Sequence, residues 1–287
     1  MVMKAKKTDI LNSFGEVLEV DYNLNNKTVE DYVRVADKYI EFHDELIPKP
    51  PQEKARKWKK YWMDRDFSNS HKNNQLRGVE KYYKFQDIDF EYKKKFETAD
   101  SNPPVLSEDQ YRNILFKGAK DKRDTAMVYV LAHSGMRASE FCRINWGDID
   151  WQKNKFENIL LKGGDEGDYI FSDTAKEAIK QYQKTRHNTN SEDPLFTSKT
   201  DTESRITRSG VYQAVLRMAE RAGLNTSDKN ICPHGFRGYF ITKMSEGGEN
   251  LEEIRRLVNH SDITMTAKYV DQTSEDKERE IHSRVFG

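Results

Sequence analysis

Residues 233–240 read Pro-His-Gly-Phe-Arg-Gly-Tyr-Phe, and this short stretch decides how the rest of the chain is interpreted. Proline favours the first turn of a helix, and Phe236 and Tyr239 follow at helical spacing, so an apolar face is expected to anchor the helix in a core. His234 and Arg237 are three residues apart and share the other face. Two hydrogen-bond donors side by side at a helix start suit an anion.

The composition indicates an intracellular protein with room for two domains. The chain has 287 residues, of which 36% are hydrophobic and 33% charged. No apolar run is long enough to span a bilayer, and the basic start of the chain lacks the apolar stretch of a signal peptide. Cys142 and Cys232 are the only cysteines, and neither belongs to a Cys-x-x-Cys pair. A disulfide framework or cysteine-rich zinc site is therefore not expected, and a reducing compartment fits best.

Charge is balanced overall but unevenly distributed. The chain has 48 basic and 48 acidic residues, yet residues 1–48 carry 6 basic against 10 acidic ones, and residues 49–95 carry 14 against 7. The segment KPPQEKARKWKKYW, residues 49–62, concentrates the positive charge and interleaves it with aromatic residues. This pattern fits either a solvated helix face with aromatic core contacts or a surface that faces phosphates. Sequence alone leaves both readings open.

The first third of the chain predicts a small helical domain. Thr28 is a good N-cap for a helix over 29–46, and a group of prolines follows that helix. A second helix is expected over 53–63, and a third carries Leu76 and Phe85 on its buried side. The domain is placed at residues 1–97, and the proline-terminated residues 98–104 are interpreted as a linker.

Residues 105–287 predict a second, larger domain that is mainly α with a small antiparallel β-sheet. Ser107 is the N-cap of its first helix, and the apolar segment RDTAMVYVLAHSGM predicts a central helix followed by a short one at RASEFCRI. Glycines at 163, 164 and 167 mark the turn of the sheet. Further helices are expected over 172–186, 207–223, 233–248 and 250–260, with a terminal one over 273–286.

Six polar residues lie at the ends of these elements, in the order Arg…Lys…His-x-x-Arg…His…Tyr. Each has an ordinary explanation by itself, such as pairing of Arg137 with Glu140 or a helix-dipole contact for His260. As an ordered set, carried by SGMRASE, LKGGDEGDYI, PHGFRGYFIT and LVNHSDITMTAKYV, they resemble the tyrosine recombinase (phage integrase) family. The resemblance covers about residues 105–287 and extends more weakly to SNSHKNNQLRGVEKYYKF. The six residues are Arg137, Lys162, His234, Arg237, His260 and Tyr269.

The resemblance implies a fold and a partner. An N-terminal helical core-binding (SAM-like) domain and a tyrosine-recombinase catalytic domain would form a clamp on double-stranded DNA. Three positions depart from the family pattern, and these departures concern loop geometry. Asn259 stands where a glycine is usual before the second histidine, Gly238 stands where a histidine or polar residue is common, and Val270-Asp271 follows the tyrosine where many relatives have a histidine.

The resemblance also implies a chemistry in which Tyr269 attacks a DNA phosphate and forms a 3′-phosphotyrosyl link. Arg137, Arg237 and His260 would stabilise the transition state, and Lys162 would protonate the leaving 5′-oxygen. His234 would assist with the tyrosine proton. The sequence has no P-loop and no carboxylate cluster suited to two metal ions, so neither metal, cofactor nor ATP is expected. Glu140 is either the carboxylate that holds Arg137 or a plain surface acid.

The implied partner is a specific recombination site in double-stranded DNA. Four copies of the chain would assemble on the DNA, and the chain is expected to be a monomer in free solution. The expected location is the cytoplasm of a prokaryotic cell or of a virus-infected prokaryotic host, away from membranes. The helix over 275–286 either docks on a neighbouring protomer or packs in its own chain. The basic residues expected to contact DNA are Lys54, Arg56, Lys57, Lys59, Lys60, Lys72 and Arg77.

Two other functions share this fold or chemistry. A DNA-binding regulator could keep the fold without strand transfer, although the intact set of six residues argues against it. A type IB topoisomerase shares the catalytic groups but would relax supercoils as a monomer without a defined site. The compact N-terminal helical domain makes this second alternative the weaker fit.

Overall fold

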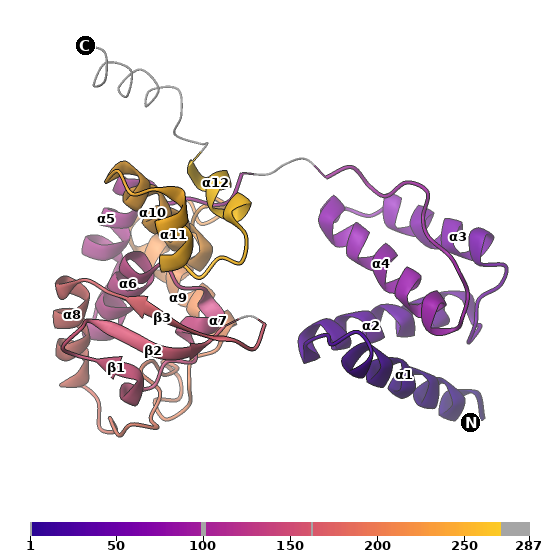
Figure 1. Ribbon diagram of the computed structural model, residues 1–287, viewed down its shortest axis with the longest axis horizontal. Helices are drawn as coiled ribbons and strands as arrows, with labels where there is room; N and C mark the ends of the chain where they lie inside the picture. Colours follow the sequence, from indigo (N-terminus) through magenta and orange to yellow (C-terminus); the bar gives the residue numbers. More distant parts are fainter. Residues whose placement is uncertain (1, 99–101, 162, 271–287) are drawn as a thin grey trace, which may run out of the picture. The chain divides into compact units, whose positions relative to one another are not determined.

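The computed structural model describes residues 2–98, 102–161 and 163–270, with the side chains of residues 2–4 and 270 excepted. The chain divides into two compact units, Met1–Ser101 and Asn102–Gly287, and each is considered by itself (Figure 1).

The N-terminal unit is built from helices α1 (Val2–Val20), α2 (Asn26–His43), α3 (Pro51–Met63) and α4 (Asn69–Phe85). Its core is rich in aromatic rings, and Trp58, Tyr39 and Tyr83 are almost completely buried in it. Helix α1 was not expected from the sequence. Helix α2 begins earlier than expected, because Asn25 and not Thr28 is its N-cap: the Asn25 side chain accepts a hydrogen bond from the Thr28 amide.

In the C-terminal unit, the first helices form the central layer. Helix α5 (Glu108–Asn113) starts with a capping box at Ser107, as expected, and runs into a π-helical turn, η1 (Ile114–Gly118). Helix α6 (Lys122–Ser134) is buried on most sides and ends at Gly135, which has a left-handed φ of 63°. The short helix α7 (Ala138–Phe141) follows directly.

A 3-stranded antiparallel sheet in the order β1-β2-β3 lies against this layer. It consists of β1 (Ile149–Asp150), preceded by a 3₁₀ turn η2 (Trp146–Asp148), β2 (Lys155–Leu160) and β3 (Glu166–Ile170). Phe156 and Tyr169 are paired across β2 and β3, and both side chains are fully buried. The buried face of β3 therefore points into the unit, toward the segments that carry the candidate site residues.

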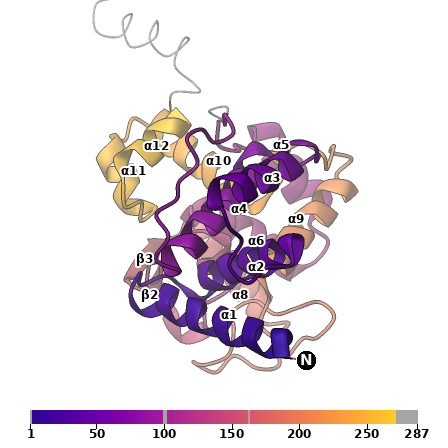
Figure 2. The same cartoon turned by 90° about the vertical axis from the view of Figure 1, so that its right-hand side faces the viewer.

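The remaining helices complete the unit. They are α8 (Asp173–Gln183), α9 (Arg208–Arg221), α10 (Pro233–Glu246), α11 (Leu251–Leu257) and α12 (Ile263–Val270). In Figures 1 and 2, α11 and α12 lie beside α10 at one end of the unit, above β3. Helix α12 was not expected as a helix, and the helix expected over 275–286 lies outside the described residues.

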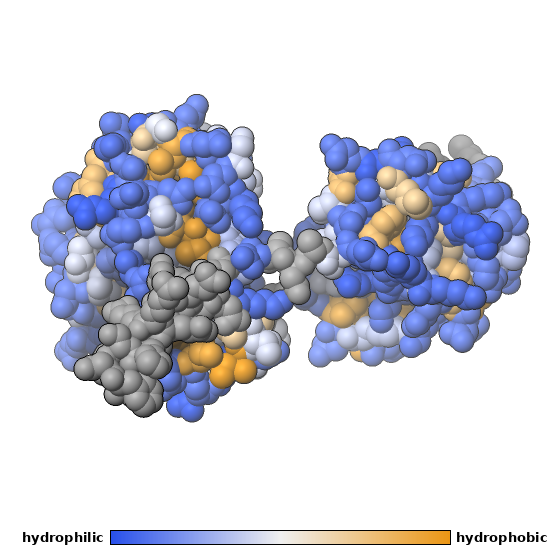
Figure 3. Space-filling model, turned by 90° about the horizontal axis from the view of Figure 1, so that it is seen from above, coloured by the Kyte–Doolittle hydropathy of each residue, from blue (hydrophilic) through white to orange (hydrophobic). Residues whose placement is uncertain are grey.

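The chain is mainly α with one small antiparallel sheet, so the predicted fold class is confirmed. Figure 3 shows a largely hydrophilic surface on each unit, with separate hydrophobic patches. Within the residues described, no helix combines the length and the apolar character needed to cross a membrane.

Candidate active site

Five of the six expected residues meet in the C-terminal unit, between α10, α12 and the turn after α6. The Tyr269 hydroxyl lies 2.7 Å from Nε2 of His234. The His260 ring stacks on the Tyr269 ring, with centroids 6.3 Å apart and planes 20° apart. The positive charges of Arg237 and Arg137 act to lower the pKa values of both Tyr269 and His260. Lys162, the sixth residue, lies outside the described residues.

Arg137 is placed by the sharp turn between α6 and α7. Gly135 makes this turn, and a Cβ there would stand 2.5 Å from the Phe240 ring in addition to straining the left-handed backbone. Glu140 then holds Arg137 twice: its carboxylate accepts from Nη1 at 3.0 Å and from the backbone amide at 2.7 Å. Because Glu140 is fully buried, it is the partner of the arginine and not a surface acid.

Arg237 lies one turn after His234 on α10 and is fully buried. Its Nη1 donates to the Gly135 carbonyl at 2.5 Å and its Nη2 to the Val258 carbonyl at 2.8 Å. Its Nε has no hydrogen-bond partner among the described residues. Burial and the nearby Arg137 lower the pKa of Arg237. A buried guanidinium held by carbonyls alone keeps most of its charge available to an anion.

Gly238, one of the departures from the family pattern, has a packing explanation. A Cβ at this position would lie 2.3 Å from the Pro104 carbonyl oxygen. The glycine therefore allows the segment before α5 to run against α10, beside Arg237.

His260 follows α11 and is 2% exposed. Its Nδ1 lies 2.8 Å from the Thr266 hydroxyl on α12. Burial, reinforced by Arg237 and Arg137, lowers its pKa to about 3. The ring is therefore neutral near pH 7, and when the Thr266 hydroxyl donates to Nδ1 the opposite nitrogen, Nε2, carries the proton that can be donated to a ligand.

The pair formed by Tyr269 and His234 can exchange a proton. Burial raises the pKa of Tyr269, while Arg237 and Arg137 act to lower it. Partial desolvation of the His234 ring, followed by the effects of Arg237 and Arg137, lowers the pKa of His234, so its imidazole is neutral near pH 7. A neutral imidazole at hydrogen-bond distance can accept the phenol proton.

The site as a whole carries an excess of positive charge. Two guanidiniums face one carboxylate, Glu140, and both histidines stay neutral. Both histidine rings contact the Tyr269 side chain, and the two guanidiniums act on its charge. The site is largely buried, so interactions with a developing negative charge are stronger there than in water. This arrangement suits nucleophilic attack of Tyr269 on an oxyanion such as a phosphate.

The basic residues expected to contact DNA in the N-terminal unit differ in availability. Arg56, Lys57, Lys60 and Arg77 are exposed, although Lys57 pairs with Glu53 at 2.7 Å. Lys54 pairs with Glu45, and Lys59 donates to the Lys94 carbonyl. Lys72 is only 9% exposed and lies over the Phe96 ring, so it is poorly placed for a surface contact.

Three contributors were missed by sequence reasoning. Thr266 orients His260, Tyr169 on β3 donates to Glu140 at 2.6 Å, and the backbone carbonyl of Asn259 accepts from Arg137 Nη1 at 3.4 Å. Tyr169 had no sequence signal beyond its place in an alternating strand. Asn259 had one, because it departs from the expected glycine, and its φ of 51° shows that it adopts the left-handed conformation a glycine would.

Comparisons with known proteins agree with this geometry. The sequence model of the phage integrase family matches residues 104–276. The chain is 26% identical over 269 residues to tyrosine recombinase XerA of Pyrococcus horikoshii, covering 93% of this chain and 90% of that protein. It is 25% identical over 305 residues to tyrosine recombinase XerC of Pediococcus pentosaceus, covering 97% and 98%.

A solved structure shares the fold. The Tn1549 transposon integrase, in complex with transposon right end DNA, superposes with a TM-score of 0.70 at 18% identity, covering 97% of this chain and 99% of that one. The match to the family model spans most of the C-terminal unit, including all six residues singled out in the sequence. The chain belongs to the phage integrase family and is a tyrosine site-specific recombinase.

Proposed function

We propose that this recombinase cuts and rejoins double-stranded DNA at a specific site through a 3′-phosphotyrosyl intermediate on Tyr269. The observation that carries the proposal is the 2.7 Å contact between the Tyr269 hydroxyl and His234 Nε2, next to two guanidiniums that keep excess positive charge. A phosphodiester brought to this oxygen meets both a nucleophile and the groups that stabilise its transition state.

The first step balances within the site. The Tyr269 oxygen bonds to phosphorus as its proton passes to His234 Nε2, and the bond from phosphorus to the 5′-oxygen breaks. Arg137, Arg237 and the Nε2 proton of His260 hydrogen-bond the non-bridging oxygens. Removing one such donor costs about 3–4 kcal/mol of barrier. The reverse step, with a 5′-hydroxyl of a partner strand, restores a phosphodiester and releases Tyr269.

Lys162 is the proposed acid for the leaving 5′-oxygen. The proposal rests on its place in the sequence, between β2 and β3 and in the motif LKGGDEGDYI. An ammonium group is a suitable donor because an unprotonated alkoxide leaves poorly, and a positioned acid contributes about 10²–10⁴-fold.

Tyr269 is 3% exposed in the protein without DNA. We therefore expect DNA binding to shift α12 enough for a phosphate to reach the hydroxyl. Thr266 lies on the same helix and hydrogen-bonds His260, so that shift would also move the His260 ring.

The proposed partner is a recombination site in double-stranded DNA, in line with the DNA complex of the Tn1549 integrase. We propose that the N-terminal unit acts as the core-binding domain and contributes phosphate contacts through Arg56, Lys57, Lys60 and Arg77, which are exposed. Exchange of strands between two duplexes needs four tyrosines, so we propose a tetramer on DNA. The proposed location is the prokaryotic cytoplasm, where the recombined DNA would belong to the chromosome, a virus or another mobile element.

The test is covalent capture on a nicked suicide duplex that carries the candidate site. Wild-type protein is expected to form an adduct stable to denaturing electrophoresis, and Tyr269→Phe is expected to bind the duplex without forming it. Tyr212→Phe, on the exposed side of α9, is the matched control and should react normally. An adduct formed by Tyr269→Phe would show that another residue is the nucleophile.

The two alternatives have distinct outcomes in the same assay. A silent regulator would bind the duplex and give no adduct with the wild-type protein. A topoisomerase-like enzyme would relax supercoiled plasmids that lack the site. Neither outcome is favoured, because the relatives named above are recombinases.

A further inference from the structure

We infer that Tyr169 and Asn259 are positioning residues. Tyr169 fixes Arg137 through Glu140, and Asn259 ties strand β3 to the His260 loop. This inference rests on the proposed function of Arg137 and adds to it two side chains that do not touch the reacting atoms. Their contacts form one connected arrangement, defined here as the β3 brace: Asn259, Tyr169 and Glu140.

The first link is buried and short. The Tyr169 hydroxyl donates to Glu140 Oε2 at 2.6 Å, and neither side chain has any exposed surface. The same carboxylate accepts from the Arg137 backbone amide and from its Nη1. Glu140 therefore has three donors, two from Arg137 and one from β3. A buried carboxylate with well-placed donors is rigid, because every loss of a partner leaves uncompensated charge.

The second link joins the His260 loop to the same strand. The Asn259 side-chain amide donates to the Asp168 backbone carbonyl at 3.0 Å, and the Asn259 backbone carbonyl accepts from Arg137 Nη1 at 3.4 Å. Gly167 on β3 leaves room for this contact, since a Cβ there would lie 3.0 Å from the Asn259 side-chain oxygen. One residue before His260, the Asn259 side chain thus contacts the strand and the Asn259 backbone contacts the arginine.

The two links meet at Arg137, whose Nη1 donates both to Glu140 and to the Asn259 backbone carbonyl. Burial and the charge of Glu140 raise the pKa of Tyr169 to about 12. The phenol therefore keeps its proton at any working pH and acts as a constant donor to Glu140. Asparagine suits position 259 because it tolerates a φ of 51° and still supplies an amide, which glycine cannot.

The consequence is mechanical coupling between three catalytic segments. Strand β3 belongs to the hairpin, Arg137 to the α6–α7 turn and His260 to the loop after α11. A small displacement of a catalytic group lowers the rate steeply even when substrate binding is unchanged. Loss of the brace should therefore reduce the cleavage rate at saturating DNA and leave DNA affinity nearly constant.

The experiment uses Tyr169→Phe in the full-length protein, with single-turnover cleavage of the nicked suicide duplex. The expected result is a cleavage rate about 10-fold lower, because one donor to a buried carboxylate is lost. The DNA concentration that gives half-maximal cleavage should change less than about 2-fold. Tyr111→Phe is the matched control. The hydroxyl of this buried tyrosine lies 3.0 Å from His133 Nε2 and not beside the β3 brace, and phenylalanine keeps the ring that stacks on Tyr239, so the cleavage rate should be unchanged.

A double-mutant cycle with Arg137→Lys shows whether Tyr169 acts through the arginine. In the Arg137→Lys background, Tyr169→Phe should cost less than about 2-fold, because the group it positions is already lost. Full additivity of the two losses, or a Tyr169→Phe protein as fast as wild type, would overturn the inference.

Asn259 is tested by comparing Asn259→Gly with Asn259→Ala. Glycine keeps the left-handed backbone and removes only the amide, so it isolates the tie to β3, whereas alanine also strains the turn. Both should be slower than wild type, with alanine the slower. A glycine variant with wild-type rate would remove Asn259 from the brace.

A readout independent of activity separates this inference from the proposed function. Hydrogen–deuterium exchange of the α7 backbone amides should speed up in Tyr169→Phe and stay unchanged in Tyr111→Phe, whether or not the protein cuts DNA. If wild-type protein forms no adduct yet the exchange changes as stated, the brace stands and the proposed function fails. Unchanged exchange at α7 would overturn the brace itself.

Discussion

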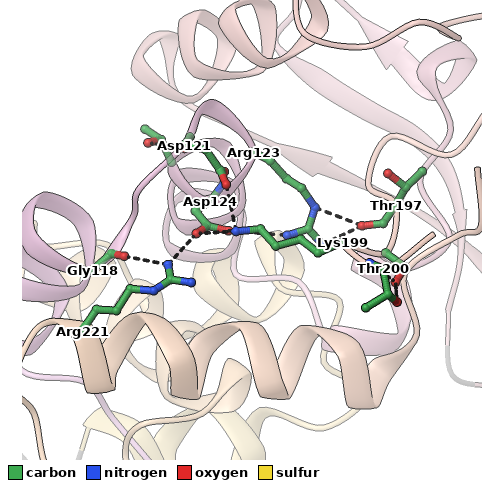
Figure 4. Close-up of polar contacts among 10 residues, drawn as sticks. Gly118, Asp121, Arg123, Asp124, Thr197, Lys199, Thr200 and Arg221 are labelled. Atoms are coloured by element: carbon green, nitrogen blue, oxygen red, sulfur yellow. Dashed lines mark hydrogen bonds and ion pairs between the residues drawn. The ribbon is translucent and has the colours of Figure 1, made fainter. Parts of the chain in front are cut away.

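Two clusters of buried charge in the C-terminal unit are balanced in different ways. In the cluster around Asp124, every cation contacts a carboxylate. Asp124 is 2% exposed and lies 3.0 Å from both Lys199 and Arg221 and 3.5 Å from Arg123, while Lys199 also reaches Asp121 (Figure 4). In the active site, no carboxylate among the described residues lies within ion-pair distance of Arg237, which is held by two carbonyls.

The difference fits a structural role for the Asp124 cluster and the catalytic role proposed for Arg137 and Arg237. Asp124 joins the start of α6 to α9 and to the segment that carries Thr197 and Lys199. The charges of its cations are therefore neutralised within the protein. Arg137 pairs with Glu140, whereas Arg237 pairs with no carboxylate among the described residues. Burial, together with the charge of both arginines, lowers the pKa values of His234 and His260. A site left short of negative charge is unfavourable in the free protein and becomes favourable when a phosphate enters.

The largest expected effect is on stability, at Asp124. Asp124→Asn leaves three cations without their shared carboxylate and should lower the free energy of unfolding by about 3–5 kcal/mol. Hydrogen–deuterium exchange of α6 and α9 should rise in proportion, and the folded fraction should still cleave DNA at the wild-type rate.

Glu157→Gln is the control for this variant. Its carboxylate pairs with Lys155 at 2.9 Å but is 37% exposed, so its loss should cost less than about 1 kcal/mol. A specific loss of cleavage by folded Asp124→Asn protein would show that the two clusters are not functionally separate.

The next effect is on chemistry, at Arg237. Arg237→Lys keeps a positive charge but replaces the planar fork that reaches both the Gly135 and Val258 carbonyls. Single-turnover cleavage should fall about 10²–10³-fold, with DNA affinity nearly unchanged. Quench-flow measurement of adduct formation checks the rate, and cleavage at wild-type speed would contradict the role given to the guanidinium.

A smaller effect is a pH dependence of stability that originates in the active site. The pKa of His260 is about 3 in the folded protein against 6.5 unperturbed. Below pH 6.5, His260 is therefore protonated in the unfolded chain but stays neutral in the folded protein. The stability contribution is complete above pH 6.5 and is lost as pH falls, by about 1.4 kcal/mol per unit. Between pH 7 and 5, His260 should therefore account for about 2 kcal/mol of lost stability.

Chemical denaturation at several pH values measures this slope. His260→Gln should flatten it, whereas the exposed His187→Gln in the same unit should not. Equal slopes for all three proteins would mean that the site does not keep His260 neutral.

The sequence was sufficient to identify the candidate catalytic residues in order, but not to find the side chains that position them. His234, Arg237, His260 and Tyr269 belong to local motifs whose spacing survives folding, and the structure brings them together. Tyr169 contacts Glu140 across 29 residues, and Asn259 contacts Asp168 across 91. Such contacts depend on the packing of β3 against the α6–α7 turn and the His260 loop, which no local pattern encodes.

The missed helices have a similar cause. Helix α12 has the sequence ITMTAKYV, rich in β-branched residues that are poor helix formers, and it is held by burial of Thr266 and Tyr269. Helix α1 contains Gly15 and packs Phe14 and Leu18 into the N-terminal core. In both cases tertiary contacts outweigh weak local propensity.

The claim that most needs testing is that the uncompensated charge of the active site is matched to the negative charge of a scissile phosphate. Arg137→Ala and wild type should be compared on two suicide duplexes, one with the normal phosphodiester and one with a neutral methylphosphonate at the same position. The expected loss for Arg137→Ala is about 10²-fold or more on the phosphodiester and less than about 3-fold on the methylphosphonate. An equal loss on both duplexes would contradict the account, because the arginine would then be acting on something other than the charge of the phosphate.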